Sequence, residues 1–595
     1  MPRLYRTPRL YRVIAAGLSV MLVVSCARSG SDQPPAASVD TANPAAPNAQ
    51  GDIAVTATRT RAAPGMPEQP SADAVTDYAA MPSPPPPPPP PYPAKMMAAP
   101  RVAEQPWVPP YHDEGRDRFT ATTQNPFTLV RDEPVSTFSI DVDTASYAFV
   151  RASLNRSTLP QPAAVRTEEL VNYFPYNYAA PTSAAQPFST NVAVFPSPWN
   201  AGRKLVRIGI RGYDVQRSTR PRANLVFLID TSGSMNEPNK LPLVKQSLNM
   251  LLDSLDGDDS VAIVTYAGYA GTALAPTSAS QKARIRNVIN SLGAGGGTAG
   301  AEGIRQAYAL AEQNLDPHGV NRVILATDGD FNIGITNQDE LKGYIERERG
   351  KGVFLSVLGF GMGNYNDALM QTLAQNGNGT AAYIDTVNEA RKTLVDEASS
   401  TLFPIAKDVK IQVEFNPATV AEYRLIGYET RMLAREDFNN DKVDAGDVGS
   451  GQTVTALYEV TPVGGPRTVD GLRYGSQPVA GRRCADCGTG GELGFVKIRY
   501  KLPRSDTSRL ISTPINHAVE YPTFAAAPQD ARFATGVAAF AELLRGGKYN
   551  GSLSYDDVLR IASAARGEDS FGYRAEFIQM VRAAKSAGAM AALER

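Results

Sequence analysis

Histidine and cysteine are scarce in this chain, which contains three of each and two tryptophans among its 595 residues. Because these side chains supply most catalytic bases and zinc ligands, little material is available for histidine-based catalysis or for a zinc centre. A surplus of positive charge is also absent, since the formal net charge is −1. Proteins that bind nucleic acids carry such a surplus, so we expect no nucleic-acid partner.

A long apolar segment is missing from the start of the chain. Residues 13–25 form an uncharged run of 13 residues, whereas a membrane-spanning helix needs ~20. Four arginines precede this run, so we predict a signal peptide over residues 1–25. The run ends in LVVSC, which resembles the bacterial lipobox and implies that Cys26 is lipidated, with palmitate-type chains. The protein would then be anchored in a bacterial cell envelope, in the outer membrane if the cell is Gram-negative. Cleavage by ordinary signal peptidase, with Cys26 incidental, is the alternative.

Residues 26–120 are rich in alanine, proline, serine and glutamine, and eight consecutive prolines occupy residues 84–91. This composition buries too little apolar surface to fold, so we predict a disordered tether. The prolines favour a stiff polyproline II spacer of roughly 25 Å, at ~3.1 Å per residue. Such a spacer would hold the folded part away from a membrane.

The remaining chain divides into three regions. In residues 222–403, short apolar runs alternate with helical patterns of 10–16 residues. This alternation predicts an α/β domain with a doubly wound, mostly parallel, Rossmann-like sheet. Residues 121–221 read as an α+β region. Residues 404–595 begin with period-two alternation and end in alanine-rich segments, which predicts an antiparallel β module followed by helices.

Five oxygen-bearing side chains of the α/β domain follow strand ends or a glycine-rich turn: Asp230, Ser232, Ser234, Thr298 and Asp328. If residues 224–230 and 321–328 are neighbouring parallel strands, these side chains meet above one edge of the sheet, where open α/β sheets bind ligands. Hydroxyls and carboxylates are hard donors that suit Mg²⁺ or Mn²⁺ and offer no soft ligand for copper or zinc.

This motif resembles the metal-ion-dependent adhesion site of the von Willebrand factor type A domain, with all five positions in family order. The resemblance implies that Ser232, Ser234 and sometimes Thr298 bind the metal directly, while Asp230 and Asp328 act largely through water. It also implies that an Asp or Glu of a protein partner fills the open coordination position. A domain that keeps the fold but binds no metal is the alternative.

Three further segments resemble a bacterial subfamily, the YfbK-like lipoproteins: residues 136–154, 326–335 and 423–460. This resemblance covers residues 127–595 and implies an N-terminal region, a von Willebrand factor type A domain and a C-terminal region. It implies no defined biochemical role.

Other motifs point to weaker interpretations. Residues 295–300 satisfy G-x-G-x-x-G, but a helix precedes them where the dinucleotide fingerprint needs a strand, so we expect no nucleotide. Asp141 and Asp143 resemble the D-x-D-x-T of haloacid-dehalogenase phosphatases, yet Thr144 comes one place early, and a polar turn before a helix is the simpler interpretation. Residues 437–449 resemble a calcium loop but lack its required glycine and glutamate, so a solvated acidic turn is expected.

Cys484 and Cys487 form a lone C-x-x-C among glycines. Zinc would need a second pair of ligands, and a thioredoxin-like role would need a βαβ context. In an oxidising envelope we therefore expect a disulfide between them.

Together these features predict a non-enzymatic, envelope-anchored protein that binds Mg²⁺ or Mn²⁺ and, through it, an acidic residue of a protein partner. General acid–base catalysis needs a base within hydrogen-bond reach, and no His, Cys or Lys base is evident beside the ligand set. Two alternatives stay open: a metal-dependent hydrolase of phosphate or ester substrates, and a scaffold whose flanking regions carry the specificity.

Overall fold

The computed structural model describes residues 117–216, 220–296, 300–329, 338–363, 365–397, 400, 402–470 and 491–593. The predicted signal peptide, the tether up to residue 116, Cys26, Thr298, Cys484 and Cys487 lie outside the described residues. Within the described ranges, every helix is too short or too polar to cross a membrane.

One sheet carries the α/β domain. In spatial order its strands are β10 (Ala381–Ile384), β9 (Val353–Phe360), β8 (Val320–Thr327), β5 (Ala223–Asp230), β6 (Ser260–Tyr266) and β7 (Ala270–Ser278). All neighbours are parallel except β7, which runs antiparallel to β6. The predicted doubly wound, mostly parallel sheet is confirmed.

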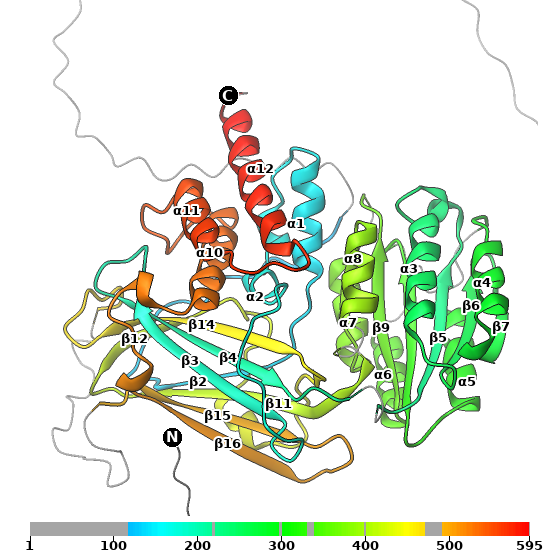
Figure 1. The fold of residues 1–595 in the computed structure, drawn as a ribbon, viewed down its shortest axis with the longest axis horizontal. Helices are drawn as coiled ribbons and strands as arrows, with labels where there is room; N and C mark the ends of the chain where they lie inside the picture. Colours follow the sequence, from blue (N-terminus) through cyan, green and yellow to red (C-terminus); the bar gives the residue numbers. More distant parts are fainter. Residues whose placement is uncertain are drawn as a thin grey trace, which may run out of the picture. The chain divides into compact units, whose positions relative to one another are not determined.

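Helices cover both faces of this sheet (Figure 1). On one face, Leu225 and Phe227 of β5 pack in a core shared with α3 (Leu241–Ser254), α4 (Lys282–Ser291) and α8 (Val387–Arg391). On the other face, Val226 and Leu228 pack in a core shared with α5 (Gly300–Gln313), α6 (Gln338–Gly350) and α7 (Asp367–Asn376). Because successive residues of a strand point to opposite faces, a strand covered on both sides is apolar throughout.

The segments before and after the α/β domain share two antiparallel sheets. The first contains β1 (Thr128–Leu129), β12 (Val420–Ile426), β14 (Thr453–Pro462), β4 (Lys204–Gly212) and β3 (Phe188–Pro196). The second contains β13 (Val448–Gly449), β11 (Pro404–Phe415), β15 (Gly494–Lys501), β16 (Ser508–Ile515) and β2 (Val135–Ser139). The two sheets enclose a common core. β2 pairs with β11 and β4 pairs with β14, so each sheet combines strands that precede the α/β domain in the sequence with strands that follow it.

Helices cover the outer face of the first antiparallel sheet (Figure 1). The C-terminal helices are α10 (Gln529–Leu544), α11 (Tyr555–Ala565) and α12 (Tyr573–Leu593). Two N-terminal helices, α1 (Ala145–Asn155) and α2 (Thr167–Val171), pack in the same layer. Phe195, Leu205 and Leu457 of the sheet pack in one core with Phe533 and Phe577 of the helices. The C-terminal antiparallel strands followed by terminal helices therefore appear as predicted.

Candidate metal-binding site

Four of the five predicted ligand residues gather at one edge of the parallel sheet. Asp230 ends β5, and Asp328 follows the last residue of β8. The two strands are hydrogen-bonded neighbours in a register that pairs Ile229 with Ala326, so both end at the same edge. Ser232 and Ser234 lie in the turn directly after β5. Thr298, the fifth residue, falls outside the described residues.

Asp230 is fully buried and held by three donors. Its Oδ1 accepts from the Ser232 backbone N–H at 2.8 Å, and its Oδ2 accepts from the Tyr266 hydroxyl at 3.2 Å and the Thr327 hydroxyl at 3.3 Å. Burial raises the pKa of Asp230, hydrogen bonds from Ser232 and Tyr266 oppose the rise, and the Asp328 charge adds to it. A bound cation would offset both the cost of burying the Asp230 charge and its repulsion from Asp328.

The two serine hydroxyls lie side by side. Ser232 Oγ and Ser234 Oγ are 3.1 Å apart. Adjacent ligands of an octahedral Mg²⁺, each at 2.0–2.1 Å from the metal, would be about 3.0 Å apart. Ser232 is buried whereas Ser234 is exposed, so the pair opens from the sheet edge toward solvent. The spacing therefore fits two neighbouring ligands of one small cation.

The glycine-rich turn that leads toward Thr298 contacts the serine turn through its backbone. The Gly233 N–H donates to the Gly296 carbonyl at 3.2 Å, and the Gly295 N–H donates to the Thr231 carbonyl at 2.8 Å. These bonds place Gly295 and Gly296 beside the serine turn, and Gly296 precedes Thr298 by two residues in the sequence. The turn follows helix α4, as the sequence indicates, and not a strand.

Lys240 also belongs to this site. Its Nζ donates to Asp328 Oδ2 at 3.1 Å, and both side chains are buried. The lysine stem crosses directly over Gly361, where any Cβ would collide with it. No lysine was evident beside the ligands from the sequence, and the structure places one there, hydrogen-bonded to Asp328. Lys240 escapes sequence reasoning because it stands six residues beyond Ser234 in a turn, with no periodicity that marks its direction.

The donor chemistry fits magnesium or manganese. The described donors are the carboxylates of Asp230 and Asp328 and the hydroxyls of Ser232 and Ser234, all of them oxygen ligands. Across the part of the chain that the structure describes, no cluster of three or more His, Cys, Asp or Glu residues could hold a metal. The site described above contains only two such residues, Asp230 and Asp328, because its other donors are hydroxyls, so it does not meet this criterion.

The acidic motifs outside this site form ion pairs. Asp141 and Asp143 accept from Arg431 at 2.8 and 2.9 Å, and Asp143 also accepts from the Ala381 N–H at 2.7 Å. In the segment that resembles a calcium loop, Asp441 accepts from Arg499 at 2.9 Å. These carboxylates connect parts of the fold.

Comparisons with known proteins agree with this architecture. A family model described as "von Willebrand factor type A domain" matches residues 224–397. A model described as "von Willebrand factor" matches residues 113–207. A third, described as "Uncharacterized protein YfbK, C-terminal", matches residues 400–587.

Individual relatives cover different shares of the chain. "Uncharacterized protein YfbK" of Escherichia coli (strain K12) is 44% identical over 79% of this chain and 81% of its own length. Human inter-alpha-trypsin inhibitor heavy chain H4 is 29% identical over 36% of this chain and 24% of its own length. Among solved structures, "von Willebrand factor type A from Catenulispora acidiphila" is 14% identical, covers 67% of this chain and 91% of its own, and has a TM-score of 0.37.

Proposed function

This chain belongs to the YfbK family of von Willebrand factor type A domain proteins, and from that premise we propose that it is an envelope-anchored protein whose metal site grips an acidic residue of a protein partner. The von Willebrand factor type A domain points to protein interaction or adhesion. The finer proposal adds the cation, Mg²⁺ or Mn²⁺, the carboxylate that it binds, and the lipid anchor at Cys26.

One observation carries the proposal: two carboxylates and two hydroxyls converge at the end of β5 and β8 beside a lysine. A divalent cation held there would meet the charges of Asp230 and Asp328, while Lys240 offsets one of them. The combined charge would then stay positive, because the serine hydroxyls add none. A positive centre at an exposed sheet edge attracts an external carboxylate.

The residues have separate tasks in this mechanism. Ser232 and Ser234 would contact the cation, with Thr298 as a further hydroxyl. Asp230 is fixed by Tyr266 and Thr327, so it presents its charge in one orientation. When bound, the cation supplies a Lewis-acidic centre for an incoming carboxylate.

We propose a binding role over catalysis because the described groups around the site include no free base. His318 precedes β8 and so lies at the other end of that strand from Asp328, and His517 lies between β16 and the C-terminal helices. The Lys240 ammonium donates a hydrogen bond to Asp328 and is not available to accept a proton while this bond is made.

The test is calorimetric titration of the full chain with MgCl₂ and MnCl₂, followed by pulldown from envelope extract with and without EDTA. We expect saturable metal uptake and metal-dependent capture of partners, both lost in Asp230→Ala. Asp253→Ala, an exposed acid on α3, is the matched control and should behave as wild type. Absence of metal uptake by the wild type would overturn the proposal. Phosphoester turnover that disappears in Asp230→Ala would favour the hydrolase.

A further inference from the structure

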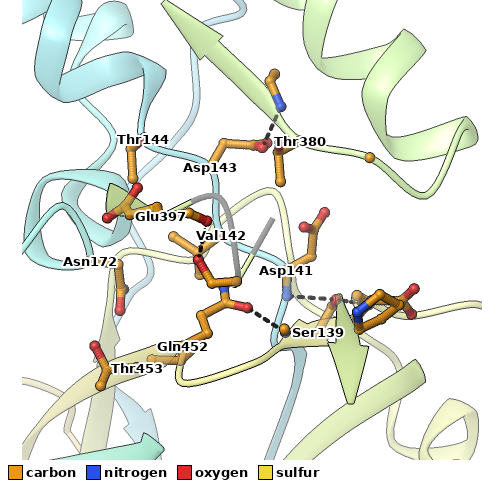
Figure 2. A pocket seen from close by; sticks show the side chains of 18 of the residues that line it. Ser139, Asp141, Val142, Asp143, Thr144, Asn172, Thr380, Glu397, Gln452 and Thr453 are labelled. Atoms are coloured by element: carbon orange, nitrogen blue, oxygen red, sulfur yellow. Dashed lines mark hydrogen bonds between the residues drawn. The ribbon is translucent and has the colours of Figure 1, made fainter. Parts of the chain in front are cut away.

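A second polar cavity lies far from the metal site along the strands. It has a volume of about 620 Å³ and is lined by residues from the α/β domain and from both flanking segments. Arg322, near the start of β8, and Ala381, the first residue of β10, line it, so it lies toward the strand ends opposite Asp328. Figure 2 shows Asp141, Asp143, Thr380 and Glu397 around it. Its size is typical of small-molecule pockets.

Most charged groups of this cavity have partners within the protein. Arg431 donates to Asp141 and Asp143, and Asp444 accepts from Arg349 at 2.8 Å. Arg211 forms an ion pair with Asp214 at 3.0 Å. These groups need no ligand to compensate their charge.

Arg322 is an exception. Its side chain is 3% exposed, and its guanidinium donates from Nη1 to the Ser356 hydroxyl at 2.6 Å. Its Nε is buried without a hydrogen-bond partner. No carboxylate of the described residues forms an ion pair with it, and Asp447 attracts it only at longer range. Burial lowers the pKa of Arg322 to about 10. A buried guanidinium that contacts no carboxylate is costly, so this position favours an anionic group from outside the chain.

Asp447 is the second exception, with the opposite charge. It lines the same cavity and accepts from the Asp408 N–H at 3.3 Å, but forms no ion pair among the described residues. Burial, followed by repulsion from Asp444, raises the pKa of Asp447 to about 7. Arg322 and Asp447 therefore line one cavity and attract each other without forming an ion pair.

We propose that this cavity binds a small zwitterion, an amino acid or short peptide, with its carboxylate on Arg322 and its ammonium near Asp447. A simple anion would satisfy Arg322 but would meet a lining with more carboxylates than guanidiniums: Asp141, Asp143, Asp214, Asp396, Glu397, Asp444 and Asp447 against Arg211, Arg322 and Arg431. A simple cation would leave Arg322 without its anion. A ligand with both charges would compensate both Arg322 and Asp447. The hydroxyls and amides of the lining can bind its remaining polar groups.

The test is calorimetric titration of the full chain with glycine, L-alanine and L-alanyl-L-alanine, and with acetate and methylammonium as single-charge probes. We expect at least one zwitterion to bind at least tenfold more tightly than acetate and methylammonium. Asp447→Asn and Arg322→Lys should each weaken it at least tenfold, and Arg322→Met more. Asp253→Asn, which changes an exposed acid of α3 outside the cavity lining, is the control and should bind within twofold of wild type.

The outcomes separate this site from the metal site. Zwitterion binding should survive in Asp230→Ala, because the two sites lie at opposite strand ends. Absence of binding by every zwitterion would mean that water alone fills the cavity, and this overturns the inference. Acetate binding as tight as that of the zwitterions would reveal a simple anion site and would also overturn it.

Discussion

Replacing Lys240 with methionine should tighten Mg²⁺ binding while it destabilises the metal-free protein. The lysine ammonium lies 3.1 Å from Asp328, one of the two carboxylates of the candidate site. Methionine keeps most of the buried stem that passes over Gly361 but removes the charge. The substitution therefore isolates the electrostatic contribution of Lys240.

The magnitude follows from Coulomb's law. At the 3.1 Å separation of Lys240 and Asp328, two unit charges interact by about 5 kcal/mol at an effective dielectric constant of about 20, and by about 1.3 kcal/mol at that of water. A divalent cation beyond the carboxylate would be roughly twice as distant with twice the charge, so its repulsion from Lys240 is of similar size. Because Lys240 and Asp328 are buried whereas Ser234 is exposed, the lower value is a minimum, and it predicts at least about tenfold tighter binding.

Without metal, the same substitution removes the Lys240 ammonium from the buried Asp328. We expect the free energy of unfolding to fall by about 1–3 kcal/mol. Titration calorimetry measures the metal affinity, and chemical denaturation with EDTA or with saturating Mg²⁺ measures stability. Lys245→Met, which removes a partly buried lysine of α3 that contacts the Asn290 carbonyl, is the control. Equal or weaker Mg²⁺ binding by Lys240→Met would refute the electrostatic reasoning.

Three further predictions address other parts of the chain. Cys26→Ser should move the protein from the membrane to the soluble fraction of bacterial cells, and unchanged membrane retention would contradict lipidation. Burial raises the pKa of Asp143 to about 8, so the folded state binds more protons than the unfolded state between about pH 4 and pH 8, and this carboxyl makes stability fall as pH rises through that window. Asp143→Asn should flatten the slope in denaturation experiments at pH 5, 6.5 and 8, whereas an unchanged slope would assign it elsewhere. Arg151→Met should cost about 3–5 kcal/mol of unfolding free energy, because Asp385 and Glu389 lose a buried guanidinium partner; a loss below about 1 kcal/mol would mean that solvent replaces it.

The convergence of Asp230, Asp328, Ser232 and Ser234 at one sheet edge could be predicted because each residue is tied to a local pattern. Asp230 and Asp328 end apolar runs long enough to be buried strands, and parallel strands place such residues at one edge. Ser232 and Ser234 follow Asp230 at alternate positions, so their approach to each other needs only a short turn. The hydrophobic pattern of short segments was sufficient to predict the ends of β5 and β8.

Lys240, Arg322 and Asp447 could not be predicted in the same way. Lys240 reaches Asp328 across 88 residues of sequence, and its path depends on a glycine at the end of another strand. Arg322 lies within the predicted strand 321–328, and the sequence does not show that its guanidinium contacts no carboxylate. That becomes known only when the neighbouring residues are placed. An unpaired buried charge is a property of the surroundings, and a sequence does not contain these surroundings explicitly.

The amino-acid sequence by itself determined the doubly wound sheet and the alignment of oxygen donors at its edge, since both follow from patterns within short segments. Only the tertiary structure decided that strands from before and after the α/β domain share two sheets, that Lys240 contacts the Asp328 carboxylate, and that Arg322 and Asp447 line a cavity without forming an ion pair. The physical reason is distance along the chain. Local periodicity fixes which face a side chain takes, whereas charge compensation and strand pairing depend on which distant segments pack against it.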